Sequence, residues 1–537
     1  MLADVYKAVG EPCAGKVLAA VVDGRCVQLT FRCWESVDVE FVDYRHPEGA
    51  RVYVRSLLHL LAKCIDDFFP RASMKVEHSI SRGYYCVVDG HGWGGADDVE
   101  IIKWRMDAIV KKDLPFVRVR ARSEEAADIF WARRMADKAK LIDSAGLGYT
   151  VFYDLGGYVD CFYGCEAMSS GDIDVYDITP FKEGILLRAP APDKPGELET
   201  PVVQEKMYDV YKESLALGLN LGLSNVGDLN MAVAGGGAAE VILVAEAMQE
   251  KQIAHIADDI AGRMAGGVRL ALISGPSSSG KTTFANRLGI QLLTNGVRPV
   301  TISMDDYFLN RHETPRDKDG EYDFESLYAL DLELFNGDLA KLFGGEEVHI
   351  PSYNFTTGMR VYQGRRLRLS DNALLVVEGI HALNPELTAG IDKGSKYGVY
   401  VSALTSISLD NHNRIPTTDN RLLRRIIRDA RFRAYPAGET IERWPSVRRG
   451  EDQWIFPFQE TADAMFNSAM LYELAALRPY AEPLLEGVRE TDSAYREARR
   501  LAHFLKYFNP IPSYMLPPSS LLREFVGMAG SDNRHAL

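Results

Sequence analysis

The sequence has few cysteines and no long apolar run. All seven cysteines lie in the first third of the 537 residues, and an odd, sparse set argues against a disulfide framework. Apolar stretches fall short of the roughly 20 residues that span a bilayer. The first residues lack the basic and then apolar segments of a signal peptide. We therefore expect a cytoplasmic protein with reduced thiols and no membrane partner.

The sequence also lacks a convincing metal-binding motif, and its basic residues are outnumbered by its acidic ones. Cys161 and Cys165 are spaced closely enough to suggest a metal site, but no partner CxxC follows them, so we do not expect one. Lys and Arg total 61 against 75 Asp and Glu, a net charge of -14. This balance argues against a general nucleic-acid coat but allows a local basic site for an anionic substrate.

Ordinary globular values remain: 46% hydrophobic and 25% charged residues. They exclude wholesale disorder, collagen and coiled-coil rods, and the length indicates about two to four domains. Asp23-Gly24 between two strand-like runs predicts a hairpin, and residues 56–70 predict a helix that ends at Pro70. Strands and helices alternate from 74 to 171, and the Pro-rich stretch 189–201 is typical of a loop or linker.

The second half has a different pattern. Helical periodicity covers residues 202–264, with a break at 234–238, and strands and helices then alternate to about 505. This alternation predicts a parallel α/β sheet. The Pro-rich tail after it predicts an extended arm.

The segment GPSSSGKT fits the phosphate-loop pattern GxxxxGK[ST] without a mismatch. A buried-strand run precedes it and an amphipathic helical run follows it, as the loop requires. Glycines turn backbone N–H groups toward a phosphate, and the helix N-terminus adds a positive dipole end. We predict that Lys281 contacts the β/γ-phosphates and that Thr282 binds Mg²⁺. The predicted nucleotide-binding residues are Gly275, Pro276, Ser277, Ser278, Ser279, Gly280, Lys281, Thr282 and Thr283.

Two further predicted strands end in carboxylates. Asp305 and Asp306 follow the strand 300–304, and Glu378 follows the strand 373–377. The carboxyl ends of parallel strands face the ligand crevice. Asp305 is therefore a candidate to take the acceptor's proton or hold Mg²⁺, and Glu378 a candidate Walker-B-type metal residue. The plainer alternatives are a helix N-cap pair and a strand-end turn.

Residues 414–449 contain ten Arg and no Lys. Arg421, Arg424, Arg428 and Arg431 recur at helical spacing on one face, and Arg suits forked contacts to phosphate oxygens. We predict a lid that closes over the transferring phosphate, with Arg424 and Arg428 as catalytic residues. A solvated charged face and a nucleic-acid patch are the alternatives.

These motifs, together with EYDFESLYALD, IPSYNFTTGMR and VVEGIHAL, resemble those of uridine kinases in the phosphoribulokinase/uridine kinase family over about residues 268–480. The resemblance implies a P-loop kinase fold and transfer of phosphate from ATP, or GTP, to a nucleoside 5′-hydroxyl, with Mg²⁺. It implies that Asp305 is the catalytic base, that Asp323 and Arg421 hold the ribose hydroxyls, and that Tyr353 packs near the base. Well-known relatives read the pyrimidine with a His where this chain has Gly358, which leaves the base open.

The first half resembles threonyl-tRNA synthetase: residues 1–50 its small β-grasp TGS domain, and residues 51–190 its α+β editing-type domain. The editing-type domain normally gathers two His with a Cys and a His from a later segment. By motif alignment these positions hold His59, Lys63, Phe162 and Glu166, so we predict that editing is lost and that Glu166 accepts a hydrogen bond from Lys63. A shift of Cys161 or Cys165 into the vacant position is the alternative.

The predicted fold is therefore α/β: a P-loop kinase with a parallel sheet, preceded by a small β-grasp domain and an α+β editing-like domain. The predicted segments are 1–50, 51–200, a helical connector at 201–267, the kinase domain at 268–505 and the arm at 506–537. We expect a uridine kinase-like homo-oligomer that binds ATP and a nucleoside. Nucleic-acid binding is left open for the first half alone. Two alternatives are an RNA-binding or tRNA-editing-related protein with an NTP switch, and a kinase of a sugar phosphate or pantothenate.

Overall fold

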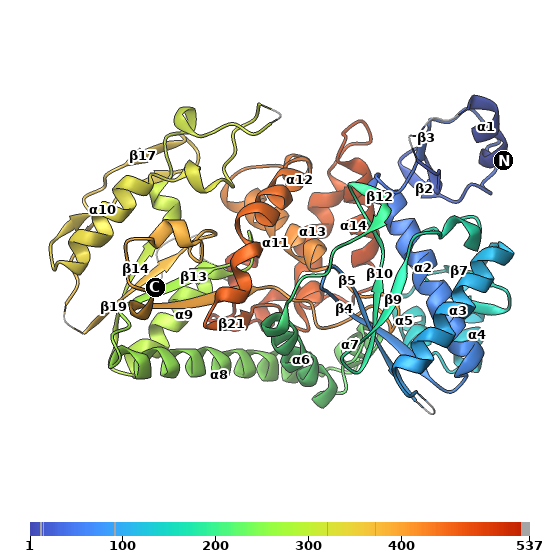
Figure 1. The fold of residues 1–537 in the computed structure, drawn as a ribbon, viewed down its shortest axis with the longest axis horizontal. Coiled ribbons are helices and arrows are strands. Elements are labelled where there is room, and N and C mark those ends of the chain that lie inside the picture. The colour runs from blue at the N-terminus through green and yellow to red at the C-terminus, as the bar shows by residue number, and fades with distance from the viewer. Residues whose placement is uncertain (11–12, 14, 91–92, 319, 371, 528–537) are drawn as a thin grey trace.

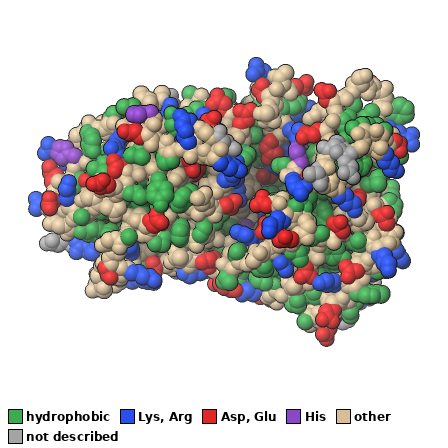
Figure 2. All heavy atoms as spheres, turned by 45° about the horizontal axis from the view of Figure 1, so that its top comes forward, with side chains coloured by type: hydrophobic (Ala, Val, Ile, Leu, Met, Phe, Trp, Pro, Cys, Tyr) green, Lys and Arg blue, Asp and Glu red, His purple; other side chains and the backbone are tan. Residues whose placement is uncertain are grey.

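The computed structural model describes residues 1–10, 13, 15–90, 93–318, 320–370 and 372–527. Antiparallel sheets make up the N-terminal half, at the right of Figure 1, and a parallel sheet lies at the left. Acidic and basic side chains are interspersed over the face shown in Figure 2. None of the helices in the described part of the chain is long and apolar enough to cross a membrane.

The first sheet is small and antiparallel, in the order β2 (Arg25–Val27), β1 (Ala19–Val22), β3 (Val39–Val42). Helix α1 (Leu2–Val9) packs beside it through the buried Leu2. The predicted hairpin is confirmed. Val22 pairs with Arg25, and Asp23 and Gly24 have φ of 46° and 74°, the left-handed backbone that a two-residue turn favours.

The long helix α2 (Pro47–Phe68) begins before the predicted segment boundary at 50/51 and is buried along most of its length. It packs against two antiparallel sheets with the orders β4-β5-β10-β9 and β6-β7-β8. The elements of this unit are β4 (Ser73–Ile80), β5 (Gly83–Asp89), α3 (Ala96–Lys112), β6 (Phe116–Arg122), α4 (Ser123–Ala132), α5 (Ala136–Ala145), β7 (Tyr149–Leu155), β8 (Tyr158–Asp160), β9 (Asp177–Phe181) and β10 (Gly184–Arg188).

The stretch predicted as a loop or linker at 189–201 contains a short hairpin of β11 (Pro190–Ala191) and β12 (Lys194–Leu198). A two-stranded ribbon has free edges, so it tolerates proline where a central strand would not. The helical pattern predicted for 202–264 is confirmed as α6 (Glu205–Asn220), α7 (Val226–Ala234) and α8 (Ala238–Met264), with the break at the glycines between the last two. Helix α8 runs along the lower edge of Figure 1 toward the parallel sheet.

The predicted parallel sheet is confirmed, with the order β14-β19-β13-β20-β21. Alternate residues of β13 face opposite cores: Leu270 and Leu272 pack with α10, while Ala271 and Ile273 pack with α8 and α9. Helices therefore cover both faces. The elements are β13 (Leu270–Ser274), α9 (Lys281–Thr294), β14 (Arg298–Ser303), α10 (Leu332–Phe343), β15 (Val348–His349), β16 (Ser352–Asn354), β17 (Met359–Val361), β18 (Arg366–Leu367), β19 (Ala373–Glu378), β20 (Lys396–Ser402) and β21 (Ala464–Asn467).

A helical core joins the two halves. Helices α11 (Thr417–Phe432), α12 (Ala437–Trp454), α13 (Glu473–Glu486) and α14 (Tyr495–Leu505) share one hydrophobic cluster with α7 and α8, in the middle of Figure 1. The described part of the tail packs into it. Phe508, Ile511 and Phe525 are fully buried, and a short helix, α15 (Arg523–Val526), ends the described chain. The rest of the predicted arm, 528–537, lies outside the described residues.

Candidate active site

The phosphate loop connects β13 to α9, as its motif predicts. Gly280 has φ of 85°, which favours glycine, and a Cβ on Gly275 would lie 2.1 Å from the carbonyl oxygen of Val401. These two glycines therefore let the loop turn tightly over the sheet edge. The loop borders a cavity of about 760 Å³, within the usual range of small-molecule sites.

Lys281 stands at the start of α9, and its side chain turns back onto the loop. Its Nζ donates to the carbonyl oxygens of Gly275 at 2.9 Å and Pro276 at 3.1 Å. Burial lowers the pKa of Lys281, and the nearby carboxylates of Glu378 and Asp305 oppose that shift. A buried ammonium beside the loop is suited to neutralise phosphate charge.

The two predicted metal residues lie together at the ends of their elements. Thr282 Oγ1 donates to Glu378 Oε1 at 3.3 Å, and Ser303 Oγ donates to the same oxygen at 2.8 Å. Burial raises the pKa of Glu378 to about 7, so a nearby cation would favour its charged form. Hydroxyl and carboxylate oxygens are the donors that Mg²⁺ prefers, with the remaining positions left to water and phosphates. These residues therefore fit the predicted ion.

Asp305 lies just after β14 and lines the cavity with Lys281 and Glu378. Glu325 lines the cavity as well, and burial raises its pKa to about 7. Carboxylates beside an ammonium in a cleft are candidates to accept a proton. Sequence patterns did not single out Glu325, because it follows no predicted strand.

The arginine helix α11 differs from its prediction. Arg421 is buried, donates to the carbonyl oxygen of Ser277 at 3.0 Å and pairs with Glu451. Arg424 is also buried and pairs with Glu473. Neither lines the cavity. Their guanidinium groups are held from behind by carboxylates of α12 and α13, because a buried charge needs a partner.

Two other arginines of α11 face the cavity instead. Arg425 donates to Ser277 Oγ at 2.6 Å and lies 3.9 Å from Glu325. Arg428 also lines the cavity and pairs with Asp429 at 2.9 Å. Of the two predicted catalytic arginines, the structure brings only Arg428 to the cavity. Arg425 was left out of the predicted set, although it follows Arg421 by four residues and so also has the spacing of that face.

Only some of the residues predicted to bind the acceptor line the cavity. Tyr353 lines the cavity and forms an aromatic cluster with Phe308 and Phe355, with ring centroids 5.2 to 6.3 Å apart. Asp323 does not line the cavity, and its Oδ1 accepts the backbone N–H of Glu325 at 3.2 Å. The predicted pair of Asp323 and Arg421 therefore does not meet in the cavity.

Arg311 occupies the space beside Gly358. A Cβ on Gly358 would lie 2.7 Å from Arg311 Nε, and Arg311 Nη2 donates to the carbonyl oxygen of Phe355 at 2.8 Å. Gly358, where the sequence resemblance led us to look for a base-reading side chain, is thus bordered by a guanidinium from another segment.

The predicted remnant of the editing site has a different pairing. His59 Nδ1 lies 2.9 Å from Glu166 Oε2, with both side chains fully buried, while Lys63 donates to Asp67 at 3.1 Å. The expected Lys63–Glu166 bond is wrong, because the imidazole of His59 takes the carboxylate. Burial alone would lower the pKa of His59, but Glu166 outweighs it and raises that pKa.

The two cysteines of this region do not replace the missing ligand. Cys161 Sγ donates to the carbonyl oxygen of Val151 at 3.3 Å, and Cys165 Sγ lies 2.9 Å from Cys26 Sγ. Among the described residues, no group of three or more His, Cys, Asp or Glu could hold a metal ion.

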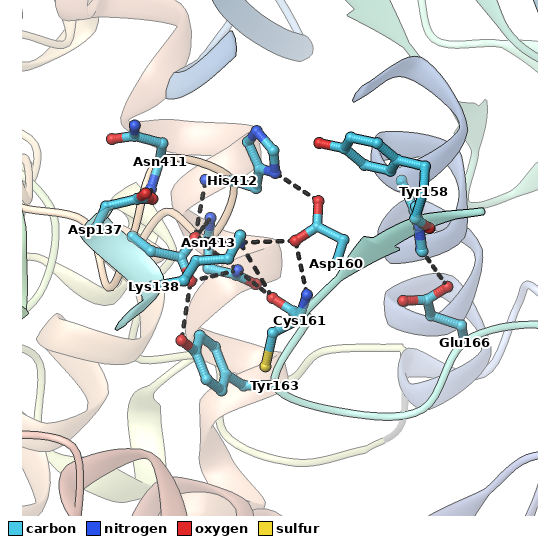
Figure 3. Close-up of polar contacts among 12 residues, drawn as sticks. Asp137, Lys138, Tyr158, Asp160, Cys161, Tyr163, Glu166, Asn411, His412 and Asn413 are labelled. Atoms are coloured by element: carbon cyan, nitrogen blue, oxygen red, sulfur yellow. Dashed lines mark hydrogen bonds and ion pairs between the residues drawn. The ribbon is translucent and has the colours of Figure 1, made fainter. Parts of the chain in front are cut away.

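A buried polar network lies beside this remnant and joins the two halves (Figure 3). Lys138 Nζ lies 2.8 Å from Asp160 and 3.0 Å from Asp410, and Tyr163 donates to Asp410 at 2.9 Å. The pKa of Asp160, which burial would raise, is held below its ordinary value chiefly by the charges of Lys138 and His412. The loop between β20 and α11 is therefore bonded to the N-terminal half.

Residues 271–474 match the profile of the Phosphoribulokinase / Uridine kinase family. The threonine–tRNA ligase of Polynucleobacter asymbioticus is 29% identical over 178 residues, 33% of this chain and 28% of that protein. The same ligase from Finegoldia magna is 30% identical over 182 residues, 34% and 28% of the two chains. The chain thus spans less than a third of the length of these relatives.

Solved structures include a possible uridine kinase from Bacillus stearothermophilus, 21% identical with a TM-score of 0.27 over 39% of this chain and 97% of that one. A putative fructose transport system kinase from a Silicibacter species is 16% identical, with a TM-score of 0.29 over 40% and 98%. The family match places the similarity to phosphoribulokinases and uridine kinases at residues 271–474, and the N-terminal half is similar to part of threonine–tRNA ligases.

Proposed function

We propose that this protein transfers the γ-phosphoryl group of ATP to the 5′-hydroxyl of a nucleoside. The observation that carries the proposal is one cavity that joins Lys281 and Asp305 to the aromatic cluster of Phe308, Tyr353 and Phe355. Donor phosphates, the acceptor hydroxyl and a planar base each have a suitable neighbour there. The family match supports the phosphoryl transfer, and the cavity supports the choice of acceptor.

In this proposal the loop's N–H groups and Lys281 bind the donor's β/γ-phosphates. Asp305 orients the acceptor hydroxyl and accepts its proton as the bond to phosphorus forms. Arg425 and Arg428, which line the same cavity, neutralise charge that spreads over the transferred group. Mg²⁺, held by Thr282 and Glu378, supplies further neutralisation of the phosphates when bound.

The aromatic cluster would bind the base. Stacking of a base on aromatic rings is worth about 1–3 kcal/mol and tolerates every base. The guanidinium groups of Arg311 and Arg433, which line the same end of the cavity, offer only hydrogen-bond donors. Arg433 also lies 4.7 Å above the ring of Phe355.

A radiolabelled-ATP screen of nucleosides and sugar phosphates tests the proposal, with Lys281→Ala as the negative control. Formation of a nucleoside monophosphate by the wild type alone is the expected result. Transfer to ribulose 5-phosphate or pantothenate alone would contradict the nucleoside, and no transfer to any acceptor would contradict the kinase. Parallel reactions with GTP settle the donor. The cytoplasmic location and the homo-oligomer stay predictions.

A further inference from the structure

A carboxylate from the far C-terminus enters the nucleotide cavity. Glu524, on α15, lines the cavity with Lys281 and Glu378. It lies beyond the residues that match the kinase family, which end at 474. The cavity is therefore completed by a segment that the family match does not include.

The bond that Glu524 makes is at the phosphate end of the cavity. Its Oε2 accepts a hydrogen bond from Thr283 Oγ1 at 2.7 Å. Thr283 is in the first turn of α9, where N–H groups and the helix dipole attract an anion. Donor phosphates would bind at this same helix end, so Glu524 occupies a place that suits a phosphate oxygen.

The segment around Glu524 is well anchored. Arg431 donates to the carbonyl oxygen of Val526, and the guanidinium of Arg424 lies 5.0 Å from the ring of Phe525. Leu521 and Leu522 are buried. These contacts fix α15 against α11 and keep the Glu524 carboxylate at Thr283.

The charge of Glu524 lacks a close cationic partner. Among the described residues no Lys or Arg nitrogen lies within 4.0 Å of its carboxylate, in contrast to Glu451, which accepts a hydrogen bond from Ser277 N–H and pairs with Arg421. Glu451 is thus paired directly with a guanidinium, whereas Glu524 acts on the Lys281 ammonium only from beyond ion-pair distance and brings its negative charge near the place of the donor phosphates. Like charges in a partly buried site repel strongly.

We propose that the Glu524 carboxylate competes with the donor's phosphates for Thr283 and so lowers the affinity for the donor. This inference rests on the proposed kinase function. Donors that carry phosphates must displace the carboxylate, whereas an unphosphorylated nucleoside need not. Glu524 therefore makes the affinity for the donor depend on its charge.

Direct binding measurements with the full-length protein test this, with ATP, ADP and adenosine as probes. Glu524→Gln keeps the size of the side chain and an acceptor for Thr283 but removes the charge. We expect its Kd for ATP and ADP to fall about tenfold, equivalent to about 1.4 kcal/mol, and its Kd for adenosine to stay unchanged. Glu524→Ala should lower the ATP Kd at least as far. The matched control is Glu240→Gln, an exposed carboxylate in the first turn of α8, which should match the wild type.

An unchanged or raised ATP Kd in folded Glu524→Gln, with phosphoryl transfer intact, would overturn this inference alone. An equal gain for adenosine would also overturn it, since the effect would then not depend on phosphate. Failure of every variant to bind ATP would overturn the proposed function as well. Thermal unfolding of each variant shows that the protein tested is folded.

Discussion

The imidazole Nδ1 of His412 lies 2.6 Å from the Oδ2 of Asp160, across 252 residues of sequence. Asp160 ends a strand of the N-terminal half, and His412 stands on the loop that leads into the arginine helix α11. Lys138 bonds to Asp160 and to Asp410 on the same loop. The two halves thus share one buried network of charges.

The first prediction concerns that network. Lys138→Ala leaves two buried carboxylates without their cation, so we expect the free energy of unfolding to fall by about 3–5 kcal/mol. Lys140→Ala is the matched control, because Lys140 is on the same helix but its pair with Asp228 is only partly buried. Lys140→Ala should lower the free energy of unfolding by no more than about 1 kcal/mol. Urea unfolding measures both, and equal losses would contradict a structural role for the network.

The second prediction concerns the chemistry. Lys281→Ala and Asp305→Asn should each lower kcat by at least about 100-fold while the protein stays folded. Asp305 acts on the acceptor's proton, so substrate binding should survive Asp305→Asn better than turnover does. Steady-state kinetics at saturating substrate check this. Turnover near the wild-type rate in either variant would remove the role assigned to that residue.

The third prediction separates the arginines of α11. Arg424→Gln breaks a fully buried pair with Glu473, so it should lower the free energy of unfolding by about 3–5 kcal/mol. Arg428→Gln removes a charge that lines the cavity, so it should lower kcat by about 10- to 100-fold with a small change in stability. Both variants are measured by urea unfolding and by kinetics. If Arg424→Gln instead lowered kcat and Arg428→Gln instead lowered stability, the lid face predicted from the sequence would be favoured again.

The fourth prediction concerns pH. Burial raises the pKa of Glu325 to about 7 from 4.5, so the folded protein binds more protons than the unfolded chain between these values. Its contribution therefore lowers the free energy of unfolding as pH rises from about 4.5 to 7, by on the order of 3 kcal/mol. Glu325→Gln should remove that part of the slope. Glu321→Gln, an exposed neighbour, should leave the slope unchanged, and an unchanged slope in Glu325→Gln would contradict the shift.

The fifth prediction is that the N-terminal half does not edit aminoacyl-tRNA. Of the four positions expected to carry reactive groups, only His59 keeps its type, and Glu166 occupies its Nδ1. Incubation with mischarged seryl-tRNA(Thr) should give no deacylation above background, and metal analysis should find no stoichiometric zinc. Deacylation that disappears in His59→Ala would show that the site is still active.

The parts of the site that follow from local sequence could be predicted. The phosphate loop, Asp305 and Glu378 stand directly after predicted strands, and the parallel sheet brings their ends together. Which side of α11 lies against the cavity could not be predicted. Helical spacing groups Arg421, Arg424 and Arg428, but which arginines are buried depends on Glu451 and Glu473, 30 and 49 residues further along the chain.

The same limit explains the other differences. Glu166 pairs with His59 and not, as predicted, with Lys63. This choice depends on how a later loop folds over α2. Glu524 follows no motif and lies in a Pro-rich tail, so nothing local connects it with Thr283, 241 residues earlier. Contacts between residues so far apart in the sequence are decided by how whole helices and strands pack, and not by local spacing.

The partners of the phosphate loop lie far along the chain, so they are synthesised well after the loop itself. Ser277 bonds to Glu451, 174 residues later, and Thr283 bonds to Glu524 near the end of the described chain. At about 5–20 residues per second, the loop emerges on the order of 10 to 50 seconds before its last partner. A nascent chain therefore carries the nucleotide loop without its last partner for somewhat less than half of translation. A chain cut short before α15 would lose part of the nucleotide site and not merely a tail.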